Sequence, residues 1–521
     1  MRVGFIVNAE FPSTVRVVRD RNAQIEVGDI LKVESNGKTY LIRIYNVRHE
    51  REANKAVIRG LMKDREEAKA IAARESSEVF EGVLLGESIG NSFKLPRTIP
   101  KIYSPVYLPS EEDLKALNLT LNFEIPIGTL RARGIENIEV KLSKTQFATH
   151  LGVYAMTGKG KTNAVLVILY SILTKLPEGD VGVLVLDVHN EYYEGSSKIA
   201  GLKHLESLED YRNRIIHYDF KKSDIHKKIS LPKLYPSEIR SILELTEAQY
   251  EALLAFKQNY GDKWFEAVEN HREQISSGTK WSETDAHKLG IKIGCFLALY
   301  RKLSLLKSCE KLVTTNIEEG LPKEVVEHLD KGRIVIVNLN NLNDLEERLI
   351  VNVLSSRILS DREKLQSINP QALTEKPYCL IVLEEAHKVL GEAVLKKGEN
   401  IFSRIVREGR KFKVGLVAIA QMPRLLDPTI ASQIQTSIIL GLSHKLDRKV
   451  VEESSTQDLS VYDSEIQVLE RGEALVVYPS ELSFPLPVKI YDFNKLVENL
   501  VKETEEKLRG KEDDGLVEVM I

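Results

Sequence analysis

The segment from Leu151 to Leu176 constrains the fold more than any other part of this chain. It contains an apolar run (LGVYAM), a glycine-containing loop (TGKGKT) and a run with helical spacing (NAVLVILYSILTKL). A second apolar run, VGVLVLDV, follows and has an acidic end. Strand, loop, helix and strand in this order are typical of a parallel sheet that is buried on both faces. We therefore expect an α/β fold built around this segment.

The loop matches the end of the phosphate-binding template G-x-x-x-x-G-K-[ST] but not its start, where Ala155 replaces glycine. In such loops backbone N–H groups point at phosphate, the lysine reaches the outer phosphates and the hydroxyl binds Mg²⁺. We expect the strand end to accommodate the methyl group of Ala155, and the loop to bind ATP with Mg²⁺. A chance G-K-T in an ordinary turn is the alternative. The expected nucleotide-binding residues here are Thr157, Gly158, Lys159, Gly160, Lys161, Thr162 and Asn163, and Thr162 is also an expected metal ligand.

Two carboxylates follow the apolar run Leu380 to Leu383 in the segment YCLIVLEEAH. At a strand end beside a phosphate loop, one carboxylate holds the water shell of Mg²⁺ and the other polarises the attacking water. We assign Glu384 to the metal and Glu385 to the water. Taken alone, two glutamates after a strand also fit a solvated helix start.

Two further segments extend the expected site. Gln421 ends the apolar run VGLVAIA and is suited to sensing the γ-phosphate, although a polar residue is also common at a strand end. In SRIVREGRKFK, Arg404, Arg407 and Arg410 recur every third residue. That spacing fits a solvated helix face, or an arginine supplied to the γ-phosphate of a neighbouring subunit. We select Arg410 for this second role.

The rest of the chain divides by composition and pattern. Short β-branched runs in the first hundred residues predict a barrel, with a helix at 60–75 inserted between its strands. Several prolines mark a connector, and long helical stretches without strand-like runs predict a helical insertion. The expected units are a barrel at 1–95, a connector at 96–144, the first part of the ATPase core at 145–234, the insertion at 235–330, the second part of the core at 331–493, and a C-terminal helix and tail at 494–521.

Bulk composition limits the classes of partner. The 521 residues carry 73 Lys and Arg against 76 Asp and Glu, a net charge of −3, so a contact with nucleic acid has to come from a local patch. The three cysteines match no zinc or redox spacing. Because no apolar run reaches the length of about 18 residues that a membrane helix needs, we expect a soluble cytoplasmic protein without a membrane contact.

Taken in order, these elements resemble the archaeal HerA family of hexameric DNA-translocating ATPases, which is related to FtsK-like motors. The resemblance covers nearly the whole chain and includes FATHLGVYAMTGKGKTN, LVLDVHNEYY, LIVLEEAH and IVREGRKFKVGL. It implies a RecA-like P-loop core with an N-terminal HAS-barrel, and a homo-hexamer with ATP at the subunit interfaces. It also implies that Asp187, His189 and Glu191 lie near the nucleotide.

The resemblance further implies double-stranded DNA in a central channel and a NurA-type nuclease docked on the barrel. The expected function is an ATP-driven DNA translocase or helicase that acts with this nuclease in DNA end resection and double-strand break repair. The alternative is a nucleotide-gated ring ATPase that recruits or regulates a nuclease, in repair or phage defence, without processive translocation. The candidate residues for lining the central channel are Lys221, Lys222, Lys227, Lys228, Lys396 and Lys397. The alternative is that they are solvated surface lysines.

Two positions depart from the family pattern. Thr149 stands where the family often has arginine, just before His150. Met422 stands within the family's Q-R-P sequence, and Arg424 is a possible substitute for the missing arginine. A second charge that acts across the subunit interface is therefore absent or relocated.

Overall fold

The computed structural model divides the chain into two compact units. Unit 1 comprises Met1–Gln146, Leu151–Ser171 and Ala420–Leu496, and unit 2 comprises Phe147–His150, Ile172–Ile419 and Val497–Ile521. The helix expected at 60–75 lies outside the described residues. The structure describes residues 1–11, 14–20, 23–51, 76–89, 92–115, 123–135, 137–221, 228–316, 318, 320–396, 400–478 and 484–518.

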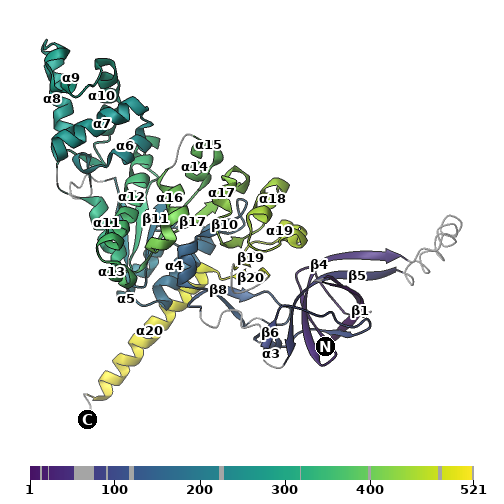
Figure 1. Ribbon diagram of the computed structural model, residues 1–521. Helices are drawn as coiled ribbons and strands as arrows, with labels where there is room; N and C mark the ends of the chain where they lie inside the picture. The colour runs from purple at the N-terminus through teal and green to yellow at the C-terminus, as the bar shows by residue number, and fades with distance from the viewer. Residues whose placement is uncertain are drawn as a thin grey trace. The chain divides into compact units, whose positions relative to one another are not determined.

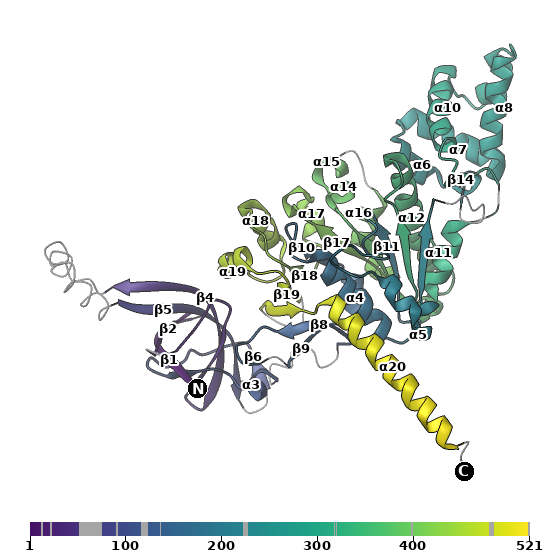
Figure 2. The ribbon, with the colours of Figure 1, turned by 180° about the vertical axis from the view of Figure 1, so that it is seen from behind.

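Unit 1 begins with an antiparallel barrel of β1 (Arg2–Glu10), β2 (Thr14–Arg19), β3 (Ile30–Ser35), β4 (Lys38–Arg51), β5 (Ser76–Ile89) and β7 (Pro105–Tyr107). The strands pair in the order β2-β1-β7-β3-β4-β5, and a pairing between β2 and β5 closes the ring. Alternate side chains such as Val15 and Val17 point inside and are fully buried. Figures 1 and 2 show β4 and β5 running side by side. The expected barrel is confirmed.

The barrel also uses a strand from the segment expected to be a connector. β7 pairs with both β1 and β3 and so fills the gap between them. Its three residues are too few to show the alternating apolar pattern of a strand. The prolines around it therefore favour the prediction of a connector. A short β6 (Ser92–Lys94) pairs with β5 outside the ring.

The second part of unit 1 holds the phosphate loop. β10 (Leu151–Tyr154) leads into the loop and pairs in parallel with β18 (Thr436–Ile439). β19 (Glu473–Val477) continues this sheet in antiparallel direction and is followed by β20 (Leu486–Ile490), β8 (Ile125–Leu130) and β9 (Glu139–Leu142). β8 and β9, which come from the expected connector, are therefore strands of the core. The α-helices of this part include most of α4 (Lys161–Lys175), together with α17 (Pro428–Ala431), α18 (Lys445–Ser454) and α19 (Asp463–Val468).

Unit 2 contains a parallel sheet. Its strands are β12 (Ile215–Asp219), β15 (Ile334–Asn338), β11 (Val181–Asp187), β16 (Tyr378–Leu383) and β17 (Val414–Ala420), in that spatial order. Every residue of β11 and β15 is buried, as expected for strands covered on both faces. α11 (Leu321–Asp330) packs on β11 and β15, and α12 (Asp344–Ile368) packs on α11. Together with the phosphate loop after β10, this sheet confirms the expected α/β P-loop core.

The helical insertion of unit 2 consists of α6 (Pro236–Leu243), α7 (Glu247–Tyr260), α8 (Trp264–Ser276), α9 (Asp285–Lys288) and α10 (Ile293–Lys307). Helices α7, α8 and α10 pack on one another (Figure 1) around Phe256 and Phe296, whose rings lie 6.0 Å apart. The expectation that this region has no strand is wrong in one detail. β14 (Val313–Thr314) pairs in parallel with β13 (Ile229–Ser230), and two residues are too short to be recognised from the sequence.

The chain ends in α20 (Phe493–Glu518), which agrees with the expected C-terminal helix. Among the described residues, no helix combines the length and the apolar character that crossing a bilayer requires.

Candidate functional site

The phosphate loop lies between β10 and α4 (Lys161–Lys175). Gly158 and Gly160 have φ angles of 84° and 104°, a region that favours glycine. A Cβ added to Gly158 would meet no atom within 4 Å, and one added to Gly160 would lie 3.9 Å from the nearest atom. The glycines therefore serve the backbone conformation, and the space beside them is open. Ala155 is fully buried and has no positive φ, so the first glycine of the template is not needed here.

The loop contacts the residue expected to sense the γ-phosphate. The Thr157 hydroxyl donates a hydrogen bond of 2.8 Å to Oε1 of Gln421, which follows β17. The structure thus brings together two expected site residues that lie 264 positions apart in the sequence.

Two expected nucleotide ligands use their side chains to hold the fold. Nζ of Lys159 donates to the carbonyl oxygen of Leu469 at 2.5 Å. The amide of Asn163 donates to the Tyr491 carbonyl at 2.7 Å and accepts from the Phe493 N–H at 3.0 Å. The side chains of these two residues are therefore engaged within the chain, and the backbone N–H of Lys159 bonds the Met156 carbonyl at 3.4 Å.

The carboxylate pair follows β16 in unit 2. The Tyr192 hydroxyl donates to Oε1 of Glu384 at 3.1 Å. Glu385 has a φ of 45°, a strained conformation for a residue with a side chain, and its carboxylate lies 3.4 Å from Nδ1 of His387. Glu384 and Glu385 thus contact different partners, Tyr192 and His387 respectively.

Asp187 organises the turn after β11. Its fully buried carboxylate accepts the N–H groups of Glu191 at 3.1 Å and Tyr192 at 3.0 Å. Burial raises the pKa of Asp187, and these backbone N–H groups lower it. Asp187, Glu191 and Glu384 are thus brought together around Tyr192.

Tyr192 is a site residue that the sequence did not reveal. Burial, Glu384 and Asp187 raise its pKa well above 10, so the hydroxyl keeps its proton and acts as a donor. It lies within the motif DVHNEYY, but the motif alone does not separate Tyr192 from Tyr193. The Tyr193 hydroxyl points elsewhere and donates to Glu206 at 3.0 Å.

The arginines after the carboxylates lie on α16 (Ile401–Glu408) and on the 3-10 helix η7 (Gly409–Phe412). Nη2 of Arg404 pairs with Glu363 at 2.6 Å. Arg407 and Arg410 are exposed. Arg410 therefore lies on the surface of this chain.

His150 is a second residue that the sequence did not single out. It is almost fully buried and has a φ of 65°. The Leu416 N–H donates to Nδ1 at 3.1 Å, which leaves the proton on Nε2 to bond the Val406 carbonyl at 3.0 Å. The ring thus connects β17 to α16 and immediately precedes β10. Burial lowers the pKa of His150 to about 4.

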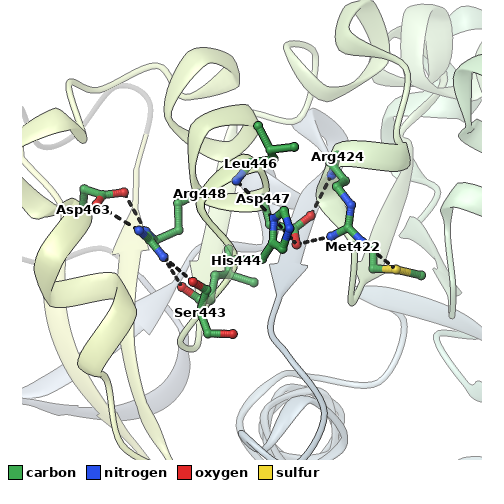
Figure 3. A network of polar contacts seen from close by, with 9 residues as sticks. Met422, Arg424, Ser443, His444, Leu446, Asp447, Arg448 and Asp463 are labelled. Atoms are coloured by element: carbon green, nitrogen blue, oxygen red, sulfur yellow. Dashed lines mark hydrogen bonds and ion pairs between the residues drawn. The ribbon is translucent and has the colours of Figure 1, made fainter.

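The possible substitute Arg424 belongs to the 3-10 helix η8 (Pro423–Leu425). Its guanidinium pairs with the buried carboxylate of Asp447, and Nη2 lies 3.3 Å from the sulfur of Met422 (Figure 3). Its charge is therefore neutralised within this chain.

Of the lysines expected to line the channel, Lys221, Lys228 and Lys396 lie within the described residues. Lys222, Lys227 and Lys397 lie outside the described residues. The others have partners: Lys221 with Asp219 at 3.7 Å, Lys228 with the Glu310 carbonyl at 2.7 Å, and Lys396 with Glu392 at 2.6 Å.

We predict that His150 makes stability depend on pH between about 6.5 and 4. In this range the unfolded chain binds a proton at this residue and the folded chain does not, so stability is lost as the pH falls. From the lowered pKa, the loss is about 3 kcal/mol. Urea unfolding at several pH values measures it. His150→Asn, which tolerates the positive φ and does not titrate, is the control; equal slopes for both proteins would contradict the prediction.

Large parts of the sequence are similar to helicases named HerA. Residues 125–358 match the family model described as the central domain of the helicase HerA. The DNA double-strand break repair helicase HerA of Saccharolobus solfataricus is 27% identical over 420 residues, covering 77% of this chain and 75% of that protein. The protein of the same name from Sulfurisphaera tokodaii is 28% identical over 442 residues, covering 80% and 79%.

A similar solved structure is the plasmid coupling protein TrwB in complex with the non-hydrolysable GTP analogue GDPNP. It has a TM-score of 0.45 and 14% sequence identity, covering 72% of this chain and 92% of that one. The family model and these relatives show that this chain is similar to HerA helicases along about three quarters of its length.

Proposed function

We propose that this chain is an ATP-driven motor that translocates along double-stranded DNA. It acts as a homo-hexamer, with a NurA-type nuclease, in DNA end resection and double-strand break repair. The observation that carries the proposal is the phosphate loop, in which two glycines with positive φ lead into a helix and Thr157 contacts Gln421. Relatives named as double-strand break repair helicases support the choice of DNA as the substrate.

The loop residues fit a nucleotide triphosphate with Mg²⁺. The open space beside Gly158 and Gly160 accepts phosphate oxygens, which the N–H groups at the start of α4 bind. Lys161, the first residue of α4, binds the outer phosphates. Thr162 and Glu384 would hold Mg²⁺, which neutralises charge on the phosphates. Glu384 acts through the water shell of the ion.

Hydrolysis is assigned to the residues at the strand ends. Glu385 orients and polarises the attacking water, and Gln421 senses the γ-phosphate and reports it to the loop through Thr157. Arg410 is the charge supplied across the subunit interface. Asp187 and Glu191 act through the turn that presents Tyr192, because the carboxylate of Asp187 is already bonded to backbone N–H groups.

We predict that linear duplex DNA raises the ATP hydrolysis rate of the wild-type protein, because a translocating motor couples turnover to movement along the duplex. Lys161→Ala should abolish turnover with and without DNA. The stimulation should weaken steeply as salt increases, since contacts to phosphates release counterions. A rate that duplex DNA leaves unchanged would rule out the motor and favour the nucleotide-gated ring.

We predict that Glu385→Gln binds ATP without hydrolysing it, and that Arg410→Ala lowers turnover by about a thousandfold while ATP still binds. Mixed rings of the two variants should regain activity, because an intact Glu385 and an intact Arg410 then meet at some interfaces. Arg404→Ala, at an exposed arginine of α16, is the matched control and should keep turnover. If no mixing ratio restores hydrolysis, Arg410 does not act across the interface.

We predict that Tyr192→Phe lowers turnover about tenfold and raises the Mg²⁺ concentration needed for half-maximal activity. The lost hydrogen bond to a carboxylate contributes about 1.5 kcal/mol, which corresponds to a factor of ten. Titration of Mg²⁺ at saturating ATP measures the shift. Tyr193→Phe removes the neighbouring hydroxyl, which bonds Glu206, and should leave the Mg²⁺ dependence as in the wild type. An unshifted Mg²⁺ dependence in Tyr192→Phe would refute this role.

A further inference from the structure

We propose that α19 couples the phosphate loop to the N-terminal barrel, with Lys159 and Glu465 as the positioning residues at its two contacts. Both contacts lie inside unit 1. The inference rests on the proposed function in that the phosphate loop has to bind ATP. It goes beyond that function because it identifies how the barrel, which is remote in sequence from the loop, senses the bound nucleotide.

The first contact joins the loop to the end of α19. Lys159 lies between the two positive-φ glycines, and its Nζ donates to the Leu469 carbonyl, directly after α19, at 2.5 Å. The Lys159 carbonyl accepts the Gly472 N–H at 3.4 Å. Both the side chain and the backbone of Lys159 therefore hold the segment that ends the helix.

The lysine side chain runs along a glycine. Gly441 has a φ of 73°, and an added Cβ would lie 3.3 Å from Cε of Lys159 and 3.2 Å from the Leu469 oxygen. The Gly441 carbonyl also accepts the N–H of Met156 in the loop at 3.2 Å. The packing leaves little room for Lys159 to move without moving its partners.

The second contact joins α19 to the barrel. Nη2 of Arg43, on β4, donates to both oxygens of Glu465 at 2.6 and 2.7 Å, and Nη1 donates to the Pro485 carbonyl at 2.7 Å. Arg131 also pairs with Glu465. The side chains of Arg43 and Glu465 are 0% and 1% exposed, so water does not weaken the pair.

One helical turn separates the two contacts. The Leu469 N–H donates to the Glu465 carbonyl at 3.1 Å, so the residue that binds Lys159 is fixed to the residue that binds Arg43. Because α19 has six residues, we expect it to move as one body. A loop that turns its N–H groups toward phosphate shifts the backbone of Lys159, and the shift reaches β4 through α19.

The other end of α19 is tied to the region of Gln421. Arg448 pairs with Asp463, the first residue of α19, at 2.6 and 3.2 Å and binds the Ser443 carbonyl (Figure 3). It also donates to the Leu442 carbonyl at 3.1 Å. The adjacent Asp447 pairs with Arg424, three residues after Gln421. The phosphate loop is therefore connected to α19 in two ways. Lys159 contacts Leu469 after the end of the helix, and Thr157 contacts Gln421, whose neighbourhood is linked to Asp463 at the start of the helix.

Hydrogen–deuterium exchange of the full-length protein tests the coupling. Exchange of β4 (Lys38–Arg51) is compared with and without a saturating non-hydrolysable ATP analogue and Mg²⁺. The expected result is a nucleotide-dependent difference in the wild type that is lost in Lys159→Met, which keeps the length of the side chain but removes its charge. Lys449→Met, at an exposed lysine of α18 that pairs with Glu453, should keep the difference.

Arg43→Lys tests the contact between β4 of the barrel and α19. Lysine keeps the charge but does not bind both Glu465 and Pro485 as the guanidinium does. We expect loss of the β4 response while ATP turnover stays at the wild-type rate. Thermal unfolding checks that this variant folds; if it does not, Lys159→Met decides the question.

The outcomes separate this inference from the proposed function. A wild-type protein that does not bind the ATP analogue would overturn the proposed function. Binding without a change in β4, or an unchanged response in Lys159→Met, would overturn the coupling alone.

Discussion

Parallel pairing of the central strands is the constraint on which the site depends. In β11 and β16, Leu186 pairs with Leu383, so Asp187 and Glu384 follow at the same edge of the sheet. Every residue of β11 is buried, which leaves polar groups to gather where the strands end. A buried carboxylate is stable only when it accepts hydrogen bonds, and Asp187 accepts them from backbone N–H groups of the turn that follows it. The hydroxyl of Tyr192 then holds the adjacent Glu384.

Backbone strain occurs in the turns after β11 and β16 and directly before β10. In unit 2, His150, Asn190 and Glu385 have φ angles of 65°, 58° and 45°. Each such residue costs about 1–3 kcal/mol and persists where its surroundings fix it. For His150 the two ring nitrogens provide this fixation, because both are bonded to backbone groups. For Asn190 the surrounding turn is fixed by the Asp187 carboxylate. Asn190 and Glu385 lie in turns that follow β11 and β16 and carry proposed site residues, whereas Glu244 and Lys413, with φ angles of 49° and 57°, lie outside these turns.

The sequence predicts features that depend on local patterns. The phosphate loop, the barrel and the polar residues after β11, β16 and β17 are all visible from apolar runs and their ends. It does not predict which side chains meet over long separations. Tyr192 and Glu384 are 192 residues apart, and Arg43 and Glu465 are 422 apart. Strands of two or three residues, such as β7 and β14, carry too few positions for a pattern.

The departures from the family pattern acquire a physical interpretation. Ala155 needs no positive φ, so the loop keeps its conformation without the first glycine. Thr149 removes a charge just before His150, but the His150 ring still holds α16 through the Val406 carbonyl. α16 leads directly into η7, which carries Arg410. Because Arg424 is neutralised by Asp447, Arg410 is the charge that we propose acts across the interface.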